Sequence, residues 1–266
     1  MWPNHSFKPT RYGRPACPRS RLGSSSAARA SRPSYAGGLT RTLGIRKPLP
    51  LRSLVIFDCD GVLVDSERLS HGVLCEMLAE LNVPISYEDA VLRFMGTSLP
   101  VCIARIEELL GRAVPADFIG CFAQRTRAAF QESLVVVPGV IEVLDALSTP
   151  FCVASNGNRA KIDFTLGHTR LLPRFKGRIF TAEDVKRPKP APDLFLHAAS
   201  TLGADPSRST VVEDSPTGVI AAKAAGMRAI GFSAMTPPAR LAEVGADAIA
   251  SSMAEVRALL AAQSDA

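Results

Sequence analysis

Beyond residue 50, two hydrophobic patterns alternate along the chain and predict an α/β fold. Continuous apolar runs, as at Leu54–Phe57 and Phe151–Ala154, are typical of strands that are buried on both faces of a sheet. From Val140 onward, such runs alternate with helical segments, which indicates a parallel sheet covered by helices on both faces. The pattern predicts strands at residues 54–57, 151–154, 178–181, 209–212 and 229–232, and helices at residues 140–147, 159–167, 192–202 and 216–225.

A block of helical character, residues 66–136, follows the first expected strand. Its apolar residues recur at helical spacing, as Leu69 and Val73 do, and no strand-like segment interrupts it. We therefore expect a helical cap that is inserted into an α/β core made of residues 51–65 and 137–266.

Residues 1–50 differ from the rest in composition and predict a disordered basic tail. They contain ten Lys and Arg residues and no Asp or Glu, and they show no hydrophobic periodicity. A transit peptide, a nucleic-acid-binding arm and an upstream extension without function all fit this composition. We favour the extension slightly, because the prolines would break the amphipathic helix of a transit peptide.

The composition of the remaining chain argues against two kinds of partner. It carries 21 basic and 25 acidic residues, so we expect no nucleic-acid partner for the folded part. No apolar run is long enough to cross a bilayer, so we expect no membrane partner. Six cysteines without CxxC spacing favour reduced thiols and hence a cytoplasmic location. A monomer is the simplest expectation for the oligomeric state.

Polar side chains gather where the expected strands end. Asp58 and Asp60 follow the first strand, Ser155 follows the second, Asp214 follows a later one, and Lys189 precedes a helix. Because ligands of open α/β sheets bind beyond the carboxyl ends of the strands, we expect these groups to converge on one edge. Crowded carboxylates repel each other unless a cation binds between them, and oxygen ligands suit Mg²⁺.

Two alternatives to a metal site compete for the aspartates. A helix N-cap role explains Asp60 or Asp214 singly, but it does not explain carboxylates at several strand ends. A calcium-binding EF-hand loop would need a ligand and a glycine where this chain has Val62 and Leu63, and helices rather than a strand would flank it. The magnesium site is therefore preferred.

A phosphate group would find its partners at the same edge of the sheet. Ser155 precedes a helix whose first amides, including that of Asn156, can bind an anion. Lys189 adds a fixed positive charge. Together with a divalent ion, these groups provide the positioning and charge neutralisation that phosphoryl transfer requires.

Four motifs, in order, resemble those of the haloacid dehalogenase-like hydrolases. They are Asp58–Asp65 (DxDGxxxD), Ser155–Gly157, Lys189–Asp193 and Glu213–Gly218, within a stretch from about Leu51 to Phe232. The resemblance implies a Rossmann-like α/β core with a helical cap. The helical insertion resembles the cap of the subgroup that contains sugar-phosphate phosphatases and β-phosphoglucomutase. Over Phe151–Gly226 the resemblance is greatest to 6-phosphogluconate phosphatases. It further implies a phosphoric monoester hydrolase that acts on a small phosphate ester and uses Mg²⁺.

The resemblance also implies a role for each central residue. Asp58 would attack phosphorus and form an aspartyl-phosphate, and Asp60 would protonate the leaving alkoxide and then activate water. Asp58, the main-chain oxygen of Asp60 and Asp214 would hold Mg²⁺. Lys189 would balance the charge on the nucleophile and the phosphate.

Further residues would support the site or bind the substrate. By the same resemblance, Ser155 and the amide of Asn156 would bind phosphoryl oxygens, and Glu213 and Asp193 would support the groups around the metal. For the rest of the substrate, Arg93 in the cap is the donor that the sequence offers.

Departures from the family pattern bear on three rival functions. A phosphomutase remains the alternative, although the mutase histidine is Ser70 here, and the cap stretch 94–99 is apolar at the two places where the mutase carries Lys and Arg. A carbon–halogen dehalogenase would leave Asp60 and Asp214 without a use. A binding module without activity is disfavoured because the residues of all four motifs are intact.

Overall fold

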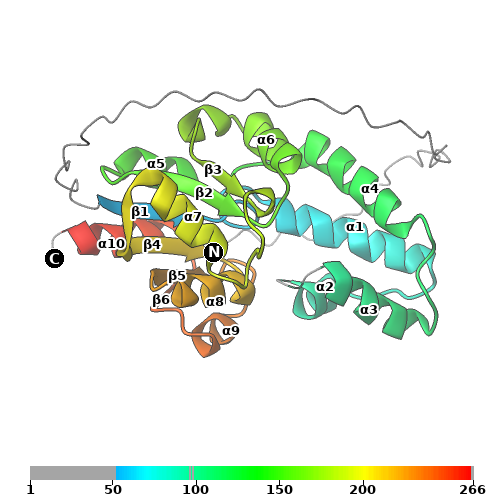
Figure 1. Cartoon of the computed structure of the whole chain (residues 1–266). Coiled ribbons are helices and arrows are strands. Elements are labelled where there is room, and N and C mark those ends of the chain that lie inside the picture. Colours follow the sequence, from blue (N-terminus) through cyan, green and yellow to red (C-terminus); the bar gives the residue numbers. More distant parts are fainter. Residues whose placement is uncertain (1–51, 96, 98, 265–266) are drawn as a thin grey trace, which may run out of the picture. The chain divides into compact units, whose positions relative to one another are not determined.

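The computed structural model describes residues 52–95, 97 and 99–264, and it confirms the predicted α/β fold with a helical insertion after the first strand (Figure 1). Six parallel strands form one sheet in the order β3-β2-β1-β4-β5-β6. The strands are β1 (Arg52–Phe57), β2 (Phe151–Ser155), β3 (Ile179–Thr181), β4 (Ala204–Glu213), β5 (Arg228–Phe232) and β6 (Ala248–Ala250). The helices are α1 (Ser66–Glu80), α2 (Tyr87–Phe94), α3 (Leu99–Leu110), α4 (Phe118–Ser133), α5 (Val140–Ala146), α6 (Arg159–His168), α7 (Asp193–Leu202), α8 (Pro216–Ala224), α9 (Pro238–Glu243) and α10 (Met253–Ser264), with 3₁₀ turns η1 (Leu172–Phe175) and η2 (Ala182–Asp184).

The strand order reverses beside β1, and this reversal determines where a ligand can bind. β1 pairs with β2 on one side, where Val55 lies opposite Phe151, and with β4 on the other, where Ile56 lies opposite Val211. Crossovers between parallel strands are right-handed, so the helices leading to β2 and β3 cover one face and those leading to β4 and β5 cover the other. The switch point lies between the carboxyl ends of β1 and β4, which is where such sheets bind ligands.

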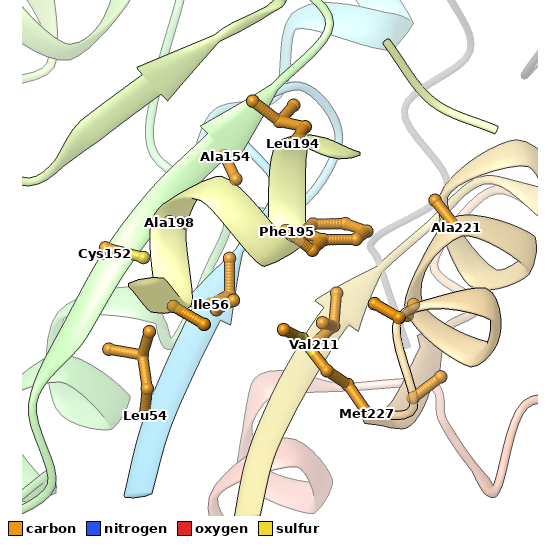
Figure 2. Close-up of a cluster of buried hydrophobic side chains, with 14 of the residues drawn as sticks. Leu54, Ile56, Cys152, Ala154, Leu194, Phe195, Ala198, Val211, Ala221 and Met227 are labelled. Atoms are coloured by element: carbon orange, nitrogen blue, oxygen red, sulfur yellow. The ribbon is translucent and has the colours of Figure 1, made fainter. Parts of the chain in front are cut away.

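A hydrophobic core between the sheet and helices α7 and α8 supports these strand ends (Figure 2). Leu54 and Ile56 alternate along β1, so both side chains belong to this core, and the fully buried Phe195 of α7 packs with them. Truncating a buried phenylalanine of this kind to alanine costs roughly 3–5 kcal/mol of stability. The packing therefore fixes the ends of β1 and β4 and the polar residues that follow them.

Helices α1 to α4 form the cap, which we define as residues 66–136 (Figure 1). The segments by which the chain enters and leaves the cap pair with each other through Val64 and Val136, the last residue of the cap. Within the cap, α1 packs against α2 and α4, and Arg125 of α4 makes a bidentate ion pair with Glu80 of α1 at 2.8 and 2.9 Å. Because Val64 soon follows β1, the paired segments keep the cap next to the carboxyl end of that strand.

Two parts of the sheet differ from the sequence prediction. β4 begins at Ala204 rather than at Ser209, because Ala204 already pairs with Arg52 across a shift in register. The sequence analysis does not predict β6 or the helices α9 and α10. β6 has three residues with an alanine at each end, which is too short to show a period.

Other expectations stay predictions. None of the described helices is long and apolar enough to cross a membrane. In the part of the chain that the structure describes, the five cysteines form no disulfide bond with one another. The cytoplasmic location, the monomeric state and the absence of a nucleic-acid partner are not tested by these observations. The predicted disordered tail, residues 1–50, lies outside the described residues.

Candidate active site

All four sequence motifs contribute to one cavity at the switch point between β1 and β4. The cavity has a volume of about 470 Å³, and core residues line one side of it while cap residues line the other. The core contributes Asp58, Asp60, Ser155, Asn156, Gly157, Lys189, Pro190, Glu213, Asp214, Ser215 and Thr217, and the cap contributes Glu67, Phe94, Met95, Thr97 and Val101. Residues that are far apart in the sequence thus meet where the fold predicts a ligand site.

Lys189 is the buried cation of the site. Its Nζ donates to Oδ1 of Asp58 at 2.6 Å, to Oε1 of Glu213 at 2.5 Å and to the main-chain oxygen of Ala154 at 2.7 Å, which uses all three ammonium protons. Burial disfavours the ammonium, but Asp58 and Glu213 outweigh burial and raise the pKa of Lys189 above its ordinary value. Lys189 therefore keeps its positive charge beside Asp58.

Two side-chain contacts hold the loop that carries Lys189. Nδ2 of Asn156 donates to the main-chain oxygen of Lys189, and its Oδ1 accepts from the main-chain nitrogen of Lys189, each at 3.0 Å. Arg187 and Asp193 form a bidentate ion pair across the same loop, at 3.0 and 2.8 Å. The side chains of Asn156 and Asp193 therefore position the lysine, and the main-chain amide of Asn156 remains the part that a phosphate could contact.

Asp58, Glu213 and Asp214 form a buried cluster of carboxylates. One oxygen of each lies within 4.8 Å of the others. Burial raises the pKa of Asp58 to about 8 in spite of Lys189. Burial, together with the charges of Glu213 and Asp58, also raises the pKa of Asp214 well above its ordinary value. A divalent cation would relieve this repulsion, and a donor set made of oxygen atoms fits Mg²⁺.

Glu213 belongs to this cluster, but both of its oxygens have other partners. Oε1 accepts from Lys189, and Oε2 accepts from the main-chain nitrogen and the hydroxyl of Ser215 at 3.1 and 2.8 Å. Gly218 of α8 makes room for the carboxylate, because a Cβ at that position would lie 1.9 Å from Oε1. Glu213 therefore orients Lys189, while Asp58 and Asp214 are better placed to hold a metal.

Gly61 allows the loop after β1 to pass close to Asp214. Its φ of +73° lies in the left-handed region, and a Cβ at this position would lie 2.0 Å from Oδ2 of Asp214. The glycine thereby permits the ends of β1 and β4 to contribute carboxylates to the same small volume.

Asp60 accepts one hydrogen bond from the first residue of α1 and one from α6. The hydroxyl of Ser66 donates to Oδ1 at 2.6 Å, and Nζ of Lys161 donates to Oδ2 at 2.7 Å. Burial opposes the charged carboxylate, but Lys161 and Ser66 outweigh burial and lower the pKa of Asp60 below its ordinary value. Among the described residues, the carboxyl oxygens of Asp60 are not part of the cluster around Asp58. This side chain is therefore available for proton transfer, and a metal contact would fall to the main-chain oxygen.

Ser155 and the turn before α6 form the corner where a phosphate is expected. Ser155 is buried at the end of β2, and its hydroxyl accepts from the main-chain nitrogen of Gly157 at 3.2 Å. Helix α6 begins two residues later, after the N-cap residue Asn158. The arrangement of a hydroxyl and main-chain amides ahead of a helix is typical of an anion site.

Two predicted site residues do not line the cavity. Asp193 acts on the Lys189 loop, as described above. Arg93 is exposed on α2, whose buried face carries Ala90, Val91 and Phe94. Helical geometry turns Arg93 away from that face, so this arrangement does not support its predicted contact with substrate.

Two residues near the reacting groups are missing from the sequence prediction. Glu67 of α1 lines the cavity, and Lys161 of α6 pairs with Asp60. Each lies in the first turn of a helix that follows a motif, so the position next to the motif was the signal available in the sequence. The charge of these residues alone gave no reason to single them out.

Comparisons with known proteins find a family model and several relatives that are similar to this chain. A family model for haloacid dehalogenase-like hydrolases matches residues 55–232. The chain is 31% identical over 183 residues to the 6-phosphogluconate phosphatase of Escherichia coli, which covers 68% of this chain and 82% of that protein. It is 33% identical over 214 residues to the validoxylamine A 7'-phosphate phosphatase of Streptomyces hygroscopicus subsp. limoneus, which covers 77% of this chain and 95% of that protein.

A solved structure supports the fold over nearly the same range. A conserved haloacid dehalogenase-like protein of unknown function from Agrobacterium tumefaciens matches with a TM-score of 0.75 and 36% identity, over 79% of this chain and 98% of that one. The relatives with phosphatase names support the predicted enzyme class, a phosphoric monoester hydrolase.

Proposed function

The chain belongs to the haloacid dehalogenase-like hydrolases, and on that basis we propose that it is a Mg²⁺-dependent phosphatase of a small phosphorylated metabolite, a sugar or sugar-acid phosphate. The observation that carries the proposal is the contact of Asp58 with Lys189 at 2.6 Å inside a buried carboxylate cluster. The names of two relatives, a 6-phosphogluconate phosphatase and a validoxylamine A 7'-phosphate phosphatase, favour a substrate of this size and kind.

The first chemical step transfers the phosphoryl group to Asp58. Lys189 occupies Oδ1 of Asp58, so Oδ2 is the oxygen that attacks phosphorus. The bond between phosphorus and the alcohol oxygen breaks, and the alkoxide takes a proton from Asp60. Mg²⁺, held by Asp58, Asp214 and the main-chain oxygen of Asp60, would supply positive charge against the phosphoryl oxygens.

The second step releases phosphate and restores Asp58. Asp60, now a carboxylate, takes a proton from a water molecule whose oxygen attacks phosphorus, and the bond between phosphorus and Oδ2 of Asp58 breaks. Lys161 and Ser66 stabilise Asp60 as a carboxylate, which is the form that this step needs. For the first step, the approach of the negative phosphate raises the proton affinity of Asp60.

The phosphomutase alternative is less well supported by the cap. A mutase must bind a second phosphate while the first is transferred, and a second phosphate needs cationic partners. Among the described residues that line the cavity, those from the cap are Glu67 and four uncharged side chains. Hydrolysis is therefore the reaction that we propose.

The test is a matched pair of substitutions, Asp58→Asn and Asp163→Asn. Both remove one carboxylate charge, but Asp163 is exposed on α6 and outside the cavity. With p-nitrophenyl phosphate and Mg²⁺, we expect Asp58→Asn to lower kcat by about 10⁴-fold or more, with an unchanged circular dichroism spectrum. Asp163→Asn should keep the parental rate. Phosphate release that survives Asp58→Asn would contradict the proposal.

A further inference from the structure

Most of the charged side chains that line the cavity are carboxylates. This excess of negative charge affects which alcohol part of a substrate can bind. Among the residues that the structure describes, five carboxylates and one ammonium line the cavity. The ammonium, that of Lys189, is bonded to Asp58 and Glu213. A second cation, Lys161, contacts the cavity residue Asp60 at 2.7 Å. Both cations are thus engaged, and neither is placed to bind a charged group at the far end of a substrate.

Glu67 brings a carboxylate to the cap side of the cavity. It lies in the first turn of α1, with a side chain that is 25% exposed. Nδ1 of His71, one turn later, donates to the main-chain oxygen of Glu67 at 2.8 Å and lies 3.5 Å from its Oε2. The shorter contact takes the ring proton, so the carboxylate of Glu67 remains able to interact with a ligand in the cavity.

Apart from Glu67, the described part of the cap wall is uncharged and mostly apolar. Phe94, Met95 and Val101 line it, and the hydroxyl of Thr97 donates to the main-chain oxygen of Phe94 at 2.7 Å. A carboxylate on the substrate would lose its hydration against these side chains without gaining a cationic partner. An ammonium group could pair with the carboxylate of Glu67. A hydroxyl group carries no charge, so its burial there costs less than that of a carboxylate.

We propose that the cavity selects phosphate esters whose alcohol part bears no second negative charge, and that Glu67 favours an ammonium group on that alcohol. This inference rests on the proposed phosphatase function and narrows its substrate class, because it disfavours sugar-acid phosphates. The apolar wall can contact only the alcohol. The charge of Glu67 also acts on Asp214, so its effect on the choice of substrate is measured by the ratio between esters and not by the rate with one ester.

Three esters built on one carbon chain test the inference. They are sorbitol 6-phosphate, its 1-amino-1-deoxy analogue and 6-phosphogluconate, which carry a hydroxyl, an ammonium and a carboxylate at C1. We expect kcat/KM to fall in the order ammonium, hydroxyl, carboxylate, with about tenfold between the first and the last at low salt. Equal values for the three esters would overturn the inference and leave the phosphatase intact.

Substitutions at Glu67 and at Val101 test whether these two residues set the order of kcat/KM among the three esters. Glu67→Gln should reduce the ammonium-to-carboxylate ratio of kcat/KM by about fivefold or more. Glu88→Gln, the same change at an exposed position of the cap, should leave the ratio unchanged. An equal loss with all three esters in Glu67→Gln would show a structural role and contradict the inference.

The substitution Val101→Lys adds a cation to the apolar cap wall. Val101 is 43% exposed, so a lysine can be accommodated there without burial of its charge. We expect it to raise the relative kcat/KM for 6-phosphogluconate by several-fold. A ratio that stays fixed would contradict the inference. No phosphate release from any of these esters or from p-nitrophenyl phosphate would instead contradict the proposed function, and the inference with it.

Discussion

The two sides of the cavity differ in how their side chains are held. On the core side, Asp58, Lys189 and Glu213 are buried and joined by hydrogen bonds of 2.5–2.6 Å. On the cap side, Phe94 and Met95 are held by burial and not by hydrogen bonds of their side chains, and Val101 is 43% exposed. The core side is thus charged and held by hydrogen bonds, whereas the described cap side, apart from Glu67, is uncharged and held by packing.

We therefore expect the core side to carry out phosphoryl transfer and the cap side to determine which substrate is accepted. A prearranged set of charges stabilises the transferring phosphoryl group whatever alcohol it leaves. An apolar wall distinguishes alcohols by fit and by the cost of burying their charges. Substitutions on the core side should therefore change the rate with every ester, while substitutions on the cap side should change the ratios between esters.

The largest effect is expected from Lys189→Met on the core side. It leaves the buried carboxylates of Asp58 and Glu213 without their cation, which should lower the free energy of unfolding by about 3 kcal/mol. Phosphate release should fall by about a thousandfold or more with every ester. Urea unfolding and a phosphate-release assay measure the two quantities.

The control for this prediction lies in the same loop. Lys186 is exposed, and Lys186→Met removes the same charge. Its stability should stay within about 0.5 kcal/mol of the parent. Similar losses in the two variants would mean that the net charge of the loop matters and that the buried contacts of Lys189 do not.

The core side is also the part that the sequence made predictable. Asp58, Ser155, Lys189 and Asp214 follow strands or precede helices in motifs, so the topology of a parallel sheet was enough to bring them together. Partners that come from helices were not predictable in this way. Lys161 contacts Asp60 because of the rotation of α6, and the sequence does not state that rotation.

Cap residues were harder to assign for the same physical reason. Arg93 and Phe94 are neighbours in sequence, yet one is exposed and the other lines the cavity. Which of them faces the core depends on how α2 packs on α1, a contact between helices that local periodicity does not orient. At the sheet edge, β6 was missed because three residues are too few to show a pattern.

A smaller effect should appear when metal and pH are varied together. Without a metal, burial raises the pKa of Asp58 to about 8, above its value in the unfolded chain. The folded state then binds protons that the unfolded state has released, so this contribution to stability is complete at low pH and is lost as pH rises through about 8. Mg²⁺ binds the deprotonated carboxylates, so its stabilising effect should grow with pH.

Thermal unfolding with EDTA and with Mg²⁺ measures this effect. The rise in Tm caused by Mg²⁺ should be several degrees at about pH 8, equivalent to roughly 2–3 kcal/mol at a concentration 100 times Kd, and smaller at about pH 5.5. Asp214→Asn should remove most of the response. A response that is equal at both pH values would argue that the metal does not bind the buried carboxylates.

The smallest effect is expected from Arg93→Ala, which tests whether the cap side works in the arrangement described. Arg93 is exposed, and its main-chain oxygen, which accepts from Arg105, is kept in the variant. We therefore expect kcat/KM to change by less than about twofold with any ester, as for most exposed positions. Phe94→Ala, one residue further on, removes a side chain that is 5% exposed and lines the cavity, so it should change the ratios between esters. If Arg93→Ala instead lowered kcat/KM by tenfold or more, α2 would have to rotate on α1 during turnover to bring Arg93 inside. The apolar wall would then be a property of the open cavity alone, and selection would be exerted by a different face of α2.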